Sequence, residues 1–202
     1  MGKQIEIYKA NDPETESKIK TINQSWLFIP EELKEINSSL GEVWSIQIAK
    51  QISLLSEGHM LDYSAESALT DILTGQSMIL TDFNQEQVIS FVKASSWLNC
   101  QGIAGWEIGS LFVRPQIQGV GLGKYMVRTL VQQPFLTQVV EPIFAVVTSD
   151  NIASIKLFKG LGWQEDIPQA DATTNYNHYI VNGVNIFEDW GLPSSVFYKP
   201  NY

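Results

Sequence analysis

Cysteine is nearly absent from this sequence: Cys100 is the only one among 202 residues. A single cysteine cannot form an intramolecular disulfide, so we expect a reducing compartment, the cytoplasm. No apolar run approaches the roughly 20 residues that a membrane-spanning helix needs, so no membrane partner is expected. The two histidines, His59 and His178, lie far apart without the neighbouring ligands of a metal site, and no metal is predicted.

Positive charge is also scarce. Lysine and arginine number 13 against 22 aspartate and glutamate residues, which leaves a formal net charge of −9. A chain this acidic could not neutralise a row of phosphates, so we expect no nucleic-acid partner. Its charge would attract a cationic small molecule at long range, although net charge can equally serve solubility alone.

The first 76 residues are predicted to be mostly helical. Polar and apolar residues alternate over 4–7, which favours a short first strand. Apolar residues recur at helical spacing over 41–55 and 64–74. The second of these helices has Ser64 as a candidate cap and Gly75 as its end.

From Ser77 the apolar period changes to that of strands. Runs over 77–83 and 87–95 predict a hairpin, and the continuous apolar run 143–148 is typical of a buried parallel strand. The other predicted elements are strands over 105–113, 179–184 and 195–199 and helices over 121–133 and 151–161. Together these elements predict an α+β fold around one mixed sheet.

A glycine-rich turn, Gln118-Gly119-Val120-Gly121-Leu122-Gly123-Lys124, follows a predicted strand and opens a helix. The glycines let backbone N–H groups approach a ligand, and a helix N-terminus presents unpaired donors and a positive dipole end. These features favour a phosphate cradle. The spacing fits neither the P-loop nor the dinucleotide fingerprint. A tight turn without a ligand remains an alternative explanation of the glycines alone.

Two segments carry a family resemblance. The stretch from Trp106 to Pro115, followed by Gln118-x-x-Gly121-x-Gly123, resembles the strand-and-loop motif of the GNAT superfamily of N-acetyltransferases. Residues 146–163 resemble the second motif of that family, in which a strand is followed by asparagine and the helix ends on glycine and an aromatic residue. The likeness is good over 77–163, loose in the C-terminal part and absent before Ser64.

The resemblance implies one acyl-CoA N-acyltransferase domain over residues 1–202, with acetyl-CoA as co-substrate. Its fold would be a mixed, mostly antiparallel central sheet flanked by helices, with splayed strands forming an acyl-CoA cleft. Residues 1–76 would form a mostly helical acceptor side, 77–163 the acyl-CoA-binding core and 164–202 the C-terminal strands.

The same resemblance assigns residues to the cofactor. A strand end would pair with the pantetheine arm, the glycine turn would hold the pyrophosphate, and the second motif would flank the thioester. The residues with these roles are Leu111, Phe112, Val113, Gln118, Gly119, Val120, Gly121, Leu122, Gly123, Lys124, Asn151, Ser154 and Phe158. For Asn151, plain helix capping is an alternative explanation.

The implied chemistry is attack of an amine on a thioester. An alkylamine has a pKa of about 10.4 and is mostly protonated near neutral pH, so a base is useful. By resemblance Glu107 is the candidate base, with a solvated strand carboxylate as the alternative, and the N–H of Val113 is the candidate oxyanion donor. Family members often place a tyrosine where this sequence has Phe158. Tyr125 or Tyr179 would then be the alternative general acids, or the thiolate leaves unassisted.

The sequence therefore predicts an acetyl-CoA-dependent N-acetyltransferase that acts on a small-molecule amine or a peptide amine. The absence of a tyrosine at position 158 keeps a second hypothesis open, a non-catalytic acyl-CoA-binding or regulatory module on the same fold. The oligomeric state is also open, with a homodimer among the alternatives.

Overall fold

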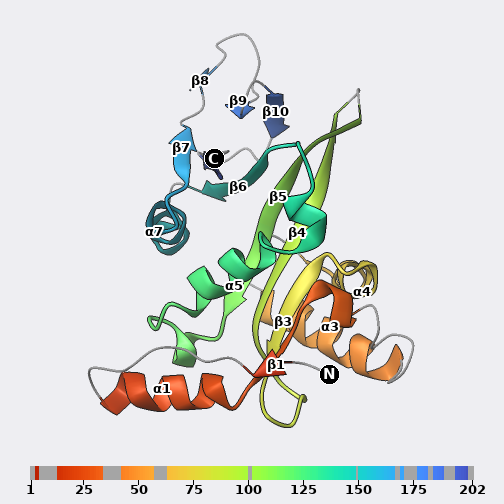
Figure 1. Ribbon diagram of the computed structural model, residues 1–202, viewed down its shortest axis with the longest axis vertical. Coiled ribbons are helices and arrows are strands. Elements are labelled where there is room, and N and C mark those ends of the chain that lie inside the picture. The colour runs from red at the N-terminus through yellow and green to blue at the C-terminus, as the bar shows by residue number, and fades with distance from the viewer. Residues whose placement is uncertain are drawn as a thin grey trace. The chain divides into compact units, whose positions relative to one another are not determined.

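The computed structural model describes residues 3–4, 13–33, 42–56, 63–99, 102–148, 150–166, 169–170, 177–181, 184–188 and 194–199 (Figure 1). Contacts divide the chain into two compact units. Unit 1 comprises Met1–Lys93 and Ser110–Leu130, and unit 2 comprises Ala94–Gly109 and Val131–Tyr202. These boundaries fall inside two strands and differ from the three portions expected from the sequence, so a single domain stays a prediction.

The helices and strands have the following bounds. The helical elements are α1 (Pro13–Asn23), α3 (Glu42–Ser56), α4 (Ala65–Thr74), η1 (Pro115–Ile117), α5 (Leu122–Leu130), α6 (Pro134–Thr137) and α7 (Ile152–Gly160). The strands are β1 (Lys3–Gln4), β2 (Trp26–Phe28), β3 (Ser77–Thr81), β4 (Val88–Asn99), β5 (Gly102–Val113), β6 (Ile143–Thr148), β7 (Gln164–Asp166), β8 (Gln169–Ala170), β9 (Asn177–Val181), β10 (Val184–Glu188) and β11 (Ser194–Tyr198).

Among the described residues the strands form two sheets. Hydrogen bonds join eight strands in the order β1-β2-β3-β4-β5-β6-β11-β7 and three in the order β10-β9-β8. β5 and β6 pair in parallel, whereas β2 with β3, β3 with β4, and β6 with β11 pair antiparallel. The predicted α+β fold with a mixed, mostly antiparallel sheet and flanking helices is therefore confirmed.

Unit 1 packs helices against both faces of its strands (Figure 1). α3 and α4 lie against one face, where their apolar stripes form one core with Ile79 and Phe91. Met78 and Leu80 point to the opposite face because side chains alternate along a strand, and both are fully buried. α5 contacts β3 and contributes the buried residues Leu122, Met126, Val127 and Leu130.

The sequence predicted the limits of α4 correctly. The hydroxyl of Ser64 accepts a hydrogen bond from the N–H of Ser67, and Gly75 ends the helix in the left-handed region at φ 65°. α3 also lies where the apolar stripe predicted it. β2 was missed, because a three-residue strand carries too little alternation to stand out from helical sequence.

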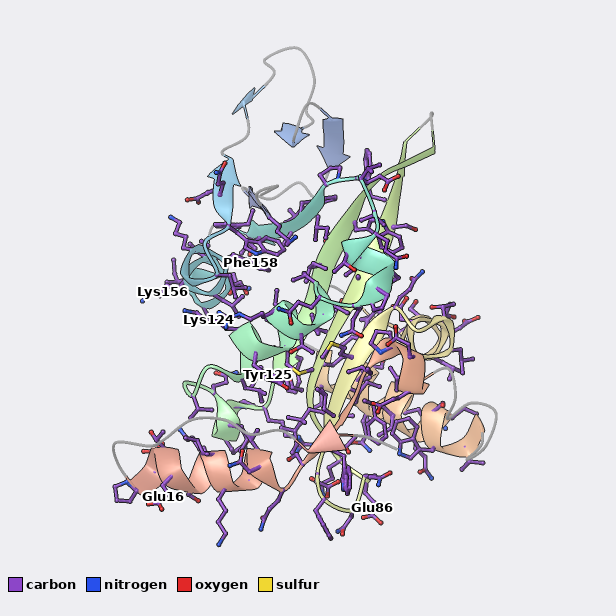
Figure 2. All side chains as sticks on the ribbon, in the orientation of Figure 1. Glu16, Glu86, Lys124, Tyr125, Lys156 and Phe158 are labelled. Carbon is purple, nitrogen blue, oxygen red and sulfur yellow. The ribbon has the colours of Figure 1, made fainter. Side chains whose placement is uncertain are left out.

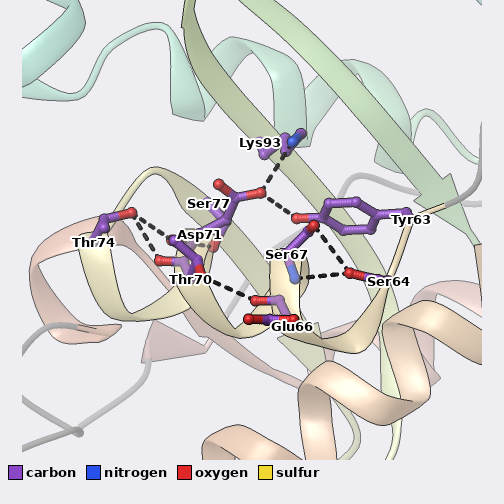
Figure 3. Close-up of polar contacts among 9 residues, drawn as sticks. All are labelled: Tyr63, Ser64, Glu66, Ser67, Thr70, Asp71, Thr74, Ser77 and Lys93. Atoms are coloured by element: carbon purple, nitrogen blue, oxygen red, sulfur yellow. Dashed lines mark hydrogen bonds and ion pairs between the residues drawn. The ribbon is translucent and has the colours of Figure 1, made fainter.

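A polar cluster fastens α4 to β4 within unit 1 (Figure 3). The hydroxyl of Tyr63 donates to the Asp71 carboxylate, which also lies 3.0 Å from the ammonium of Lys93. That ammonium stands 4.6 Å from the centre of the Tyr63 ring. Burial, together with the bond to Asp71, raises the pKa of Tyr63 far above its ordinary value, so the phenol stays a donor.

Unit 2 is built on β6, which pairs with β5 on one side and β11 on the other. Glu107 lies opposite Phe144 in the parallel pair. Phe158 of α7 stacks on Phe197 of β11 with 5.7 Å between ring centres. Two parallel strands cannot be joined by a tight turn, so the chain must cross over between β5 and β6. The strand–helix–strand order of the sequence predicted this crossover.

Two predicted bounds were wrong. The single strand expected over 179–184 is a hairpin of β9 and β10, with Val181 opposite Val184. The intervening pair, Asn182-Gly183, is a strong short hairpin signal that was overlooked. The helix expected over 121–133 ends at Leu130, and Pro134 opens α6, a position that proline favours. Residues 5–7 of the first predicted strand lie outside the described residues.

Candidate functional site

The glycine turn of unit 1 is held in shape by Gln118. Its side-chain amide donates to the carbonyl of Val113 at 2.8 Å, which ties the turn to the end of β5. Gly119 and Gly121 then adopt φ +90° and +86°, conformations that other residues rarely accept. A Cβ atom added at either glycine would meet no atom within 4 Å. Space for a ligand therefore remains beside both glycines.

α5 begins directly after this turn. The N–H of Tyr125 donates to the carbonyl of Gly121 at 3.1 Å, so the N–H groups of Leu122, Gly123 and Lys124 precede the first intrahelical bond. Leu122 is buried, whereas Lys124 and Tyr125, labelled in Figure 2, are half-buried. The first turn of α5 thus combines unpaired helical donors with a cation, as an anion site requires.

The end of β5 is fastened on its neighbour β4. The hydroxyl of Ser90 donates to the carbonyl of Phe112 at 2.7 Å. The backbone N–H of Arg114 donates to Ile89, and its Nε donates to Val88. No role was predicted from the sequence for Ser90 or Arg114. The position of Arg114, directly after Val113 in the first motif, is the signal that could have identified it.

Glu107 lies on the part of β5 that belongs to unit 2. A Cβ added at Gly109 would stand 3.4 Å from Oε1 of Glu107, so the carboxylate lies over Gly109 on one face, as alternation predicts. Ser110 then has φ +51°, which is unusual for a residue other than glycine. Regular alternation along the strand would place Leu111 and Val113 on the same face as Glu107. The left-handed Ser110 interrupts this alternation, so it does not extend past residue 110.

The second motif also belongs to unit 2, and the side chains of Asn151 and Phe158 have structural partners. Oδ1 of the exposed Asn151 accepts from the N–H of Ser154 at 3.1 Å and caps α7. Ser154 is half-buried. Phe158, labelled in Figure 2, is 4% exposed and contacts Trp163 as well as Phe197. The backbone of Tyr179 lies in β9 opposite Ile186, and its side chain is outside the described residues.

The predicted residues therefore divide between the units. Unit 1 brings together the strand end Leu111–Val113, the turn Gln118–Gly121 and the first turn of α5. Glu107, Asn151, Ser154, Phe158 and Tyr179 belong to unit 2. Within the part of the chain that the structure describes, no group of three or more His, Cys, Asp or Glu residues could hold a metal. No helix there is long and apolar enough to cross a membrane.

Comparison with known sequences decides the family. A sequence model described as the acetyltransferase (GNAT) family matches residues 48–163, which include α4, the glycine turn and α7. The chain belongs to the GNAT acetyltransferase family. The match also begins earlier than the resemblance noted in the sequence, since it takes in most of α3. No curated protein matches the chain.

Several solved structures share the fold at low identity. Diaminobutyrate acetyltransferase EctA from Paenibacillus lautus, solved with L-2,4-diaminobutyric acid and coenzyme A, has 16% identity and a TM-score of 0.51, covering 86% of this chain and 93% of its own. A chain of the NatC complex bound to Gag peptide and CoA has 15% identity and a TM-score of 0.53, with coverage of 76% and 92%. YncA from Salmonella typhimurium, a putative acetyltransferase solved with acetyl-CoA, has 16% identity and a TM-score of 0.50, with coverage of 87% and 92%.

Proposed function

We propose that this protein is an N-acetyltransferase that transfers the acetyl group of acetyl-CoA directly to a primary amine. The observation that carries the proposal is the turn at Gly119 and Gly121. Two left-handed glycines with open space beside them stand at the start of a helix, inside the region that matches the GNAT family. The similar structures named above were solved with acetyl-CoA or CoA, which supports the same co-substrate here.

The residues of unit 1 fit the cofactor's polar parts. The N–H groups from Gly119 to Lys124 would bind the diphosphate, because helix N-termini and glycine turns direct several donors at one anion. Gln118 and Ser90 engage the carbonyls of Val113 and Phe112, which fixes the strand end along which the pantetheine arm would lie. Asn151, Ser154 and Phe158 would flank that arm from α7.

The proposed reaction requires loss of one proton from the amine and release of coenzyme A as a thiolate. The amine nitrogen attacks the thioester carbon, and the C–S bond breaks. The thiol of coenzyme A resembles a free thiol, with a pKa of about 8.5. Glu107 would accept the amine's proton, directly or through water. The N–H of Val113 would donate to the developing oxyanion. Tyr125 or Tyr179 would protonate the thiolate, or it would depart without an acid.

The acceptor is proposed to be a small-molecule amine or a peptide amine. EctA was solved with a diamine and NatC with a peptide, so both classes occur among proteins of this fold. The acidic net charge of −9 favours a cationic acceptor. We also propose a single domain and a cytoplasmic location, the latter because Cys100 is the only cysteine.

The buried ring of Phe158 favours a second candidate, an acyl-CoA-binding module without turnover, because a phenyl ring cannot protonate a thiolate. A thiol-release assay with acetyl-CoA and a panel of diamines and peptides tests the two together with calorimetric binding of acetyl-CoA. Binding with amine-dependent thiol release supports the transferase. Binding without release on any amine supports the module, and absence of binding rejects both.

A further inference from the structure

Helix α1 lies outside the region that matches the GNAT family, yet it contacts the segment that leads into the glycine turn. α1 touches η1, and Figure 1 shows it running beside the connection between β5 and α5. Ile22 is fully buried at its C-terminal end and Ile117 of η1 is 8% exposed. This helix is therefore a packed part of unit 1.

Lys18 is the residue through which α1 reaches the turn. Its ammonium nitrogen lies 3.5 Å from the carbonyl oxygen of Gln118, the residue immediately before Gly119. The same nitrogen lies 2.7 Å from the carboxylate of Glu14. The Lys18 side chain is 24% exposed and that of Glu14 is 79% exposed. The cation is thus held close to the turn while its acidic partner remains in solvent.

We propose that Lys18 binds the diphosphate of acyl-CoA directly, so that α1 completes the cofactor site from outside the family-matched region. This inference rests on the proposed function. An ammonium group has three donors, and a neutral carbonyl and one carboxylate do not exhaust them. The ion pair with Glu14 is partly exposed to solvent and contributes little, so this contact is easily exchanged for one with phosphate.

The charges around the turn support this role. Lys124 stands in the first turn of α5 and Arg128 one turn further on, while Glu14 is the acidic group paired with Lys18. In a chain with a net charge of −9, a dianionic diphosphate needs local cations to overcome the repulsion of the whole molecule. The ammonium of Lys18 lies at the carbonyl of Gln118, which points away from the N–H of Gly119 because the peptide between them is trans. The flexible Lys18 side chain must therefore leave this carbonyl to contact the diphosphate.

The test compares Lys18→Met with Lys20→Met, an exposed lysine of the same helix, by calorimetric binding to the full-length protein. The ligands are coenzyme A, 3′-dephospho-coenzyme A and pantetheine. We expect Lys18→Met to weaken the binding of coenzyme A and of 3′-dephospho-coenzyme A equally, by about tenfold, because one charge-assisted hydrogen bond is lost. Binding of pantetheine, which lacks the diphosphate, should not change, and Lys20→Met should behave as the wild type.

A variant of the acidic partner of Lys18 gives a second measurement. Glu14→Gln should tighten the binding of coenzyme A by less than about threefold, because it removes a weak competing partner of Lys18. Equal affinity of wild type and Lys18→Met for coenzyme A would reject the contact, as would equal weakening of pantetheine. A loss limited to coenzyme A would also overturn it, since the contact would then be to the 3′-phosphate. Absence of coenzyme A binding in the wild type would instead reject the proposed function.

Discussion

The glycine turn of unit 1 and helix α7 of unit 2 were both assigned to the cofactor, but they differ in what else explains them. The turn offers backbone groups, and the space beside Gly119 and Gly121 contains no protein atom within 4 Å of an added Cβ. In the α7 region two of the three assigned side chains already have a structural role: Asn151 caps the helix and Phe158 packs on Phe197. A residue with no structural partner points to a ligand more strongly than a residue that has one.

A third glycine sharpens this difference. Gly162 in unit 2 also has a positive φ, +79°, and also has no atom within 4 Å of an added Cβ. It follows the last turn of α7, where the N–H of Trp163 bonds the carbonyl of Phe158, so it serves to end a helix. Gly121 precedes a helix, and the start of a helix does not need a left-handed residue. A positive φ alone therefore does not indicate a ligand site; a positive φ at the start of a helix supports the proposed one.

The largest effect is expected from Gly121→Glu compared with Gly162→Glu. Both substitutions place a carboxylate on a left-handed residue and should cost about 1–2 kcal/mol of stability. Only Gly121→Glu puts the charge in the proposed diphosphate site, so acetyl-CoA binding should weaken at least about 100-fold, about 2.7 kcal/mol at 1.36 kcal/mol per tenfold. Calorimetry and thermal melts check both variants. Similar binding by the two variants would remove the distinction between the turn and the helix end.

Glu107→Gln tests whether the carboxylate of Glu107, a residue of unit 2, acts as the general base. We expect kcat to fall about 100-fold near neutral pH, the scale of a lost general base. The deficit should shrink as pH rises towards the pKa of the amine, about 10.4, because the free amine then forms without help. Rates of mutant and wild type are measured between about pH 6.5 and 9.5. A constant ratio across this range would eliminate Glu107 as the base.

Asn151→Ala separates capping from cofactor binding, with Ser64→Ala as the matched control. Both side chains accept from the N–H three residues on, at 3.1 Å, and each variant should lose about 1 kcal/mol of stability. If Asn151 also contacts the pantetheine arm, only Asn151→Ala should weaken the binding of acetyl-CoA, by about fivefold, because one hydrogen bond is lost. Unchanged affinity in Asn151→Ala would leave capping as its whole role.

The smallest effect is expected from Phe158→Tyr. The ring is buried, so the added hydroxyl should cost about 1 kcal/mol unless it finds an acceptor. If position 158 lies beside the thioester sulfur, kcat should rise about threefold at neutral pH with the Kd of acetyl-CoA unchanged, and the gain should vanish at alkaline pH. A kcat that stays the same or falls, in a variant that remains folded, would show that thiolate protonation does not limit the rate.

The same contrast explains how much could be predicted from the sequence. Local signals were sufficient for α4, whose cap and terminal glycine lie within the helix's own sequence, and for the buried run of β6. They were sufficient for the glycine turn for the same reason. The stacking of Phe158 on Phe197 is a contact between distant segments, which no local pattern carries. The contact of Lys18 with Gln118, 100 residues away, was missed for this reason too.

The most direct test of the central claim measures binding of acetyl-CoA and acetyl-pantetheine to the wild type and to Gly121→Glu. Acetyl-pantetheine carries the same thioester without phosphates, so the turn should matter only for acetyl-CoA. We predict that wild type binds acetyl-CoA much more tightly than acetyl-pantetheine, and that Gly121→Glu removes this advantage while leaving acetyl-pantetheine unaffected. Equal loss of both ligands, or a wild type that does not distinguish them, would contradict the assignment of the turn to the diphosphate.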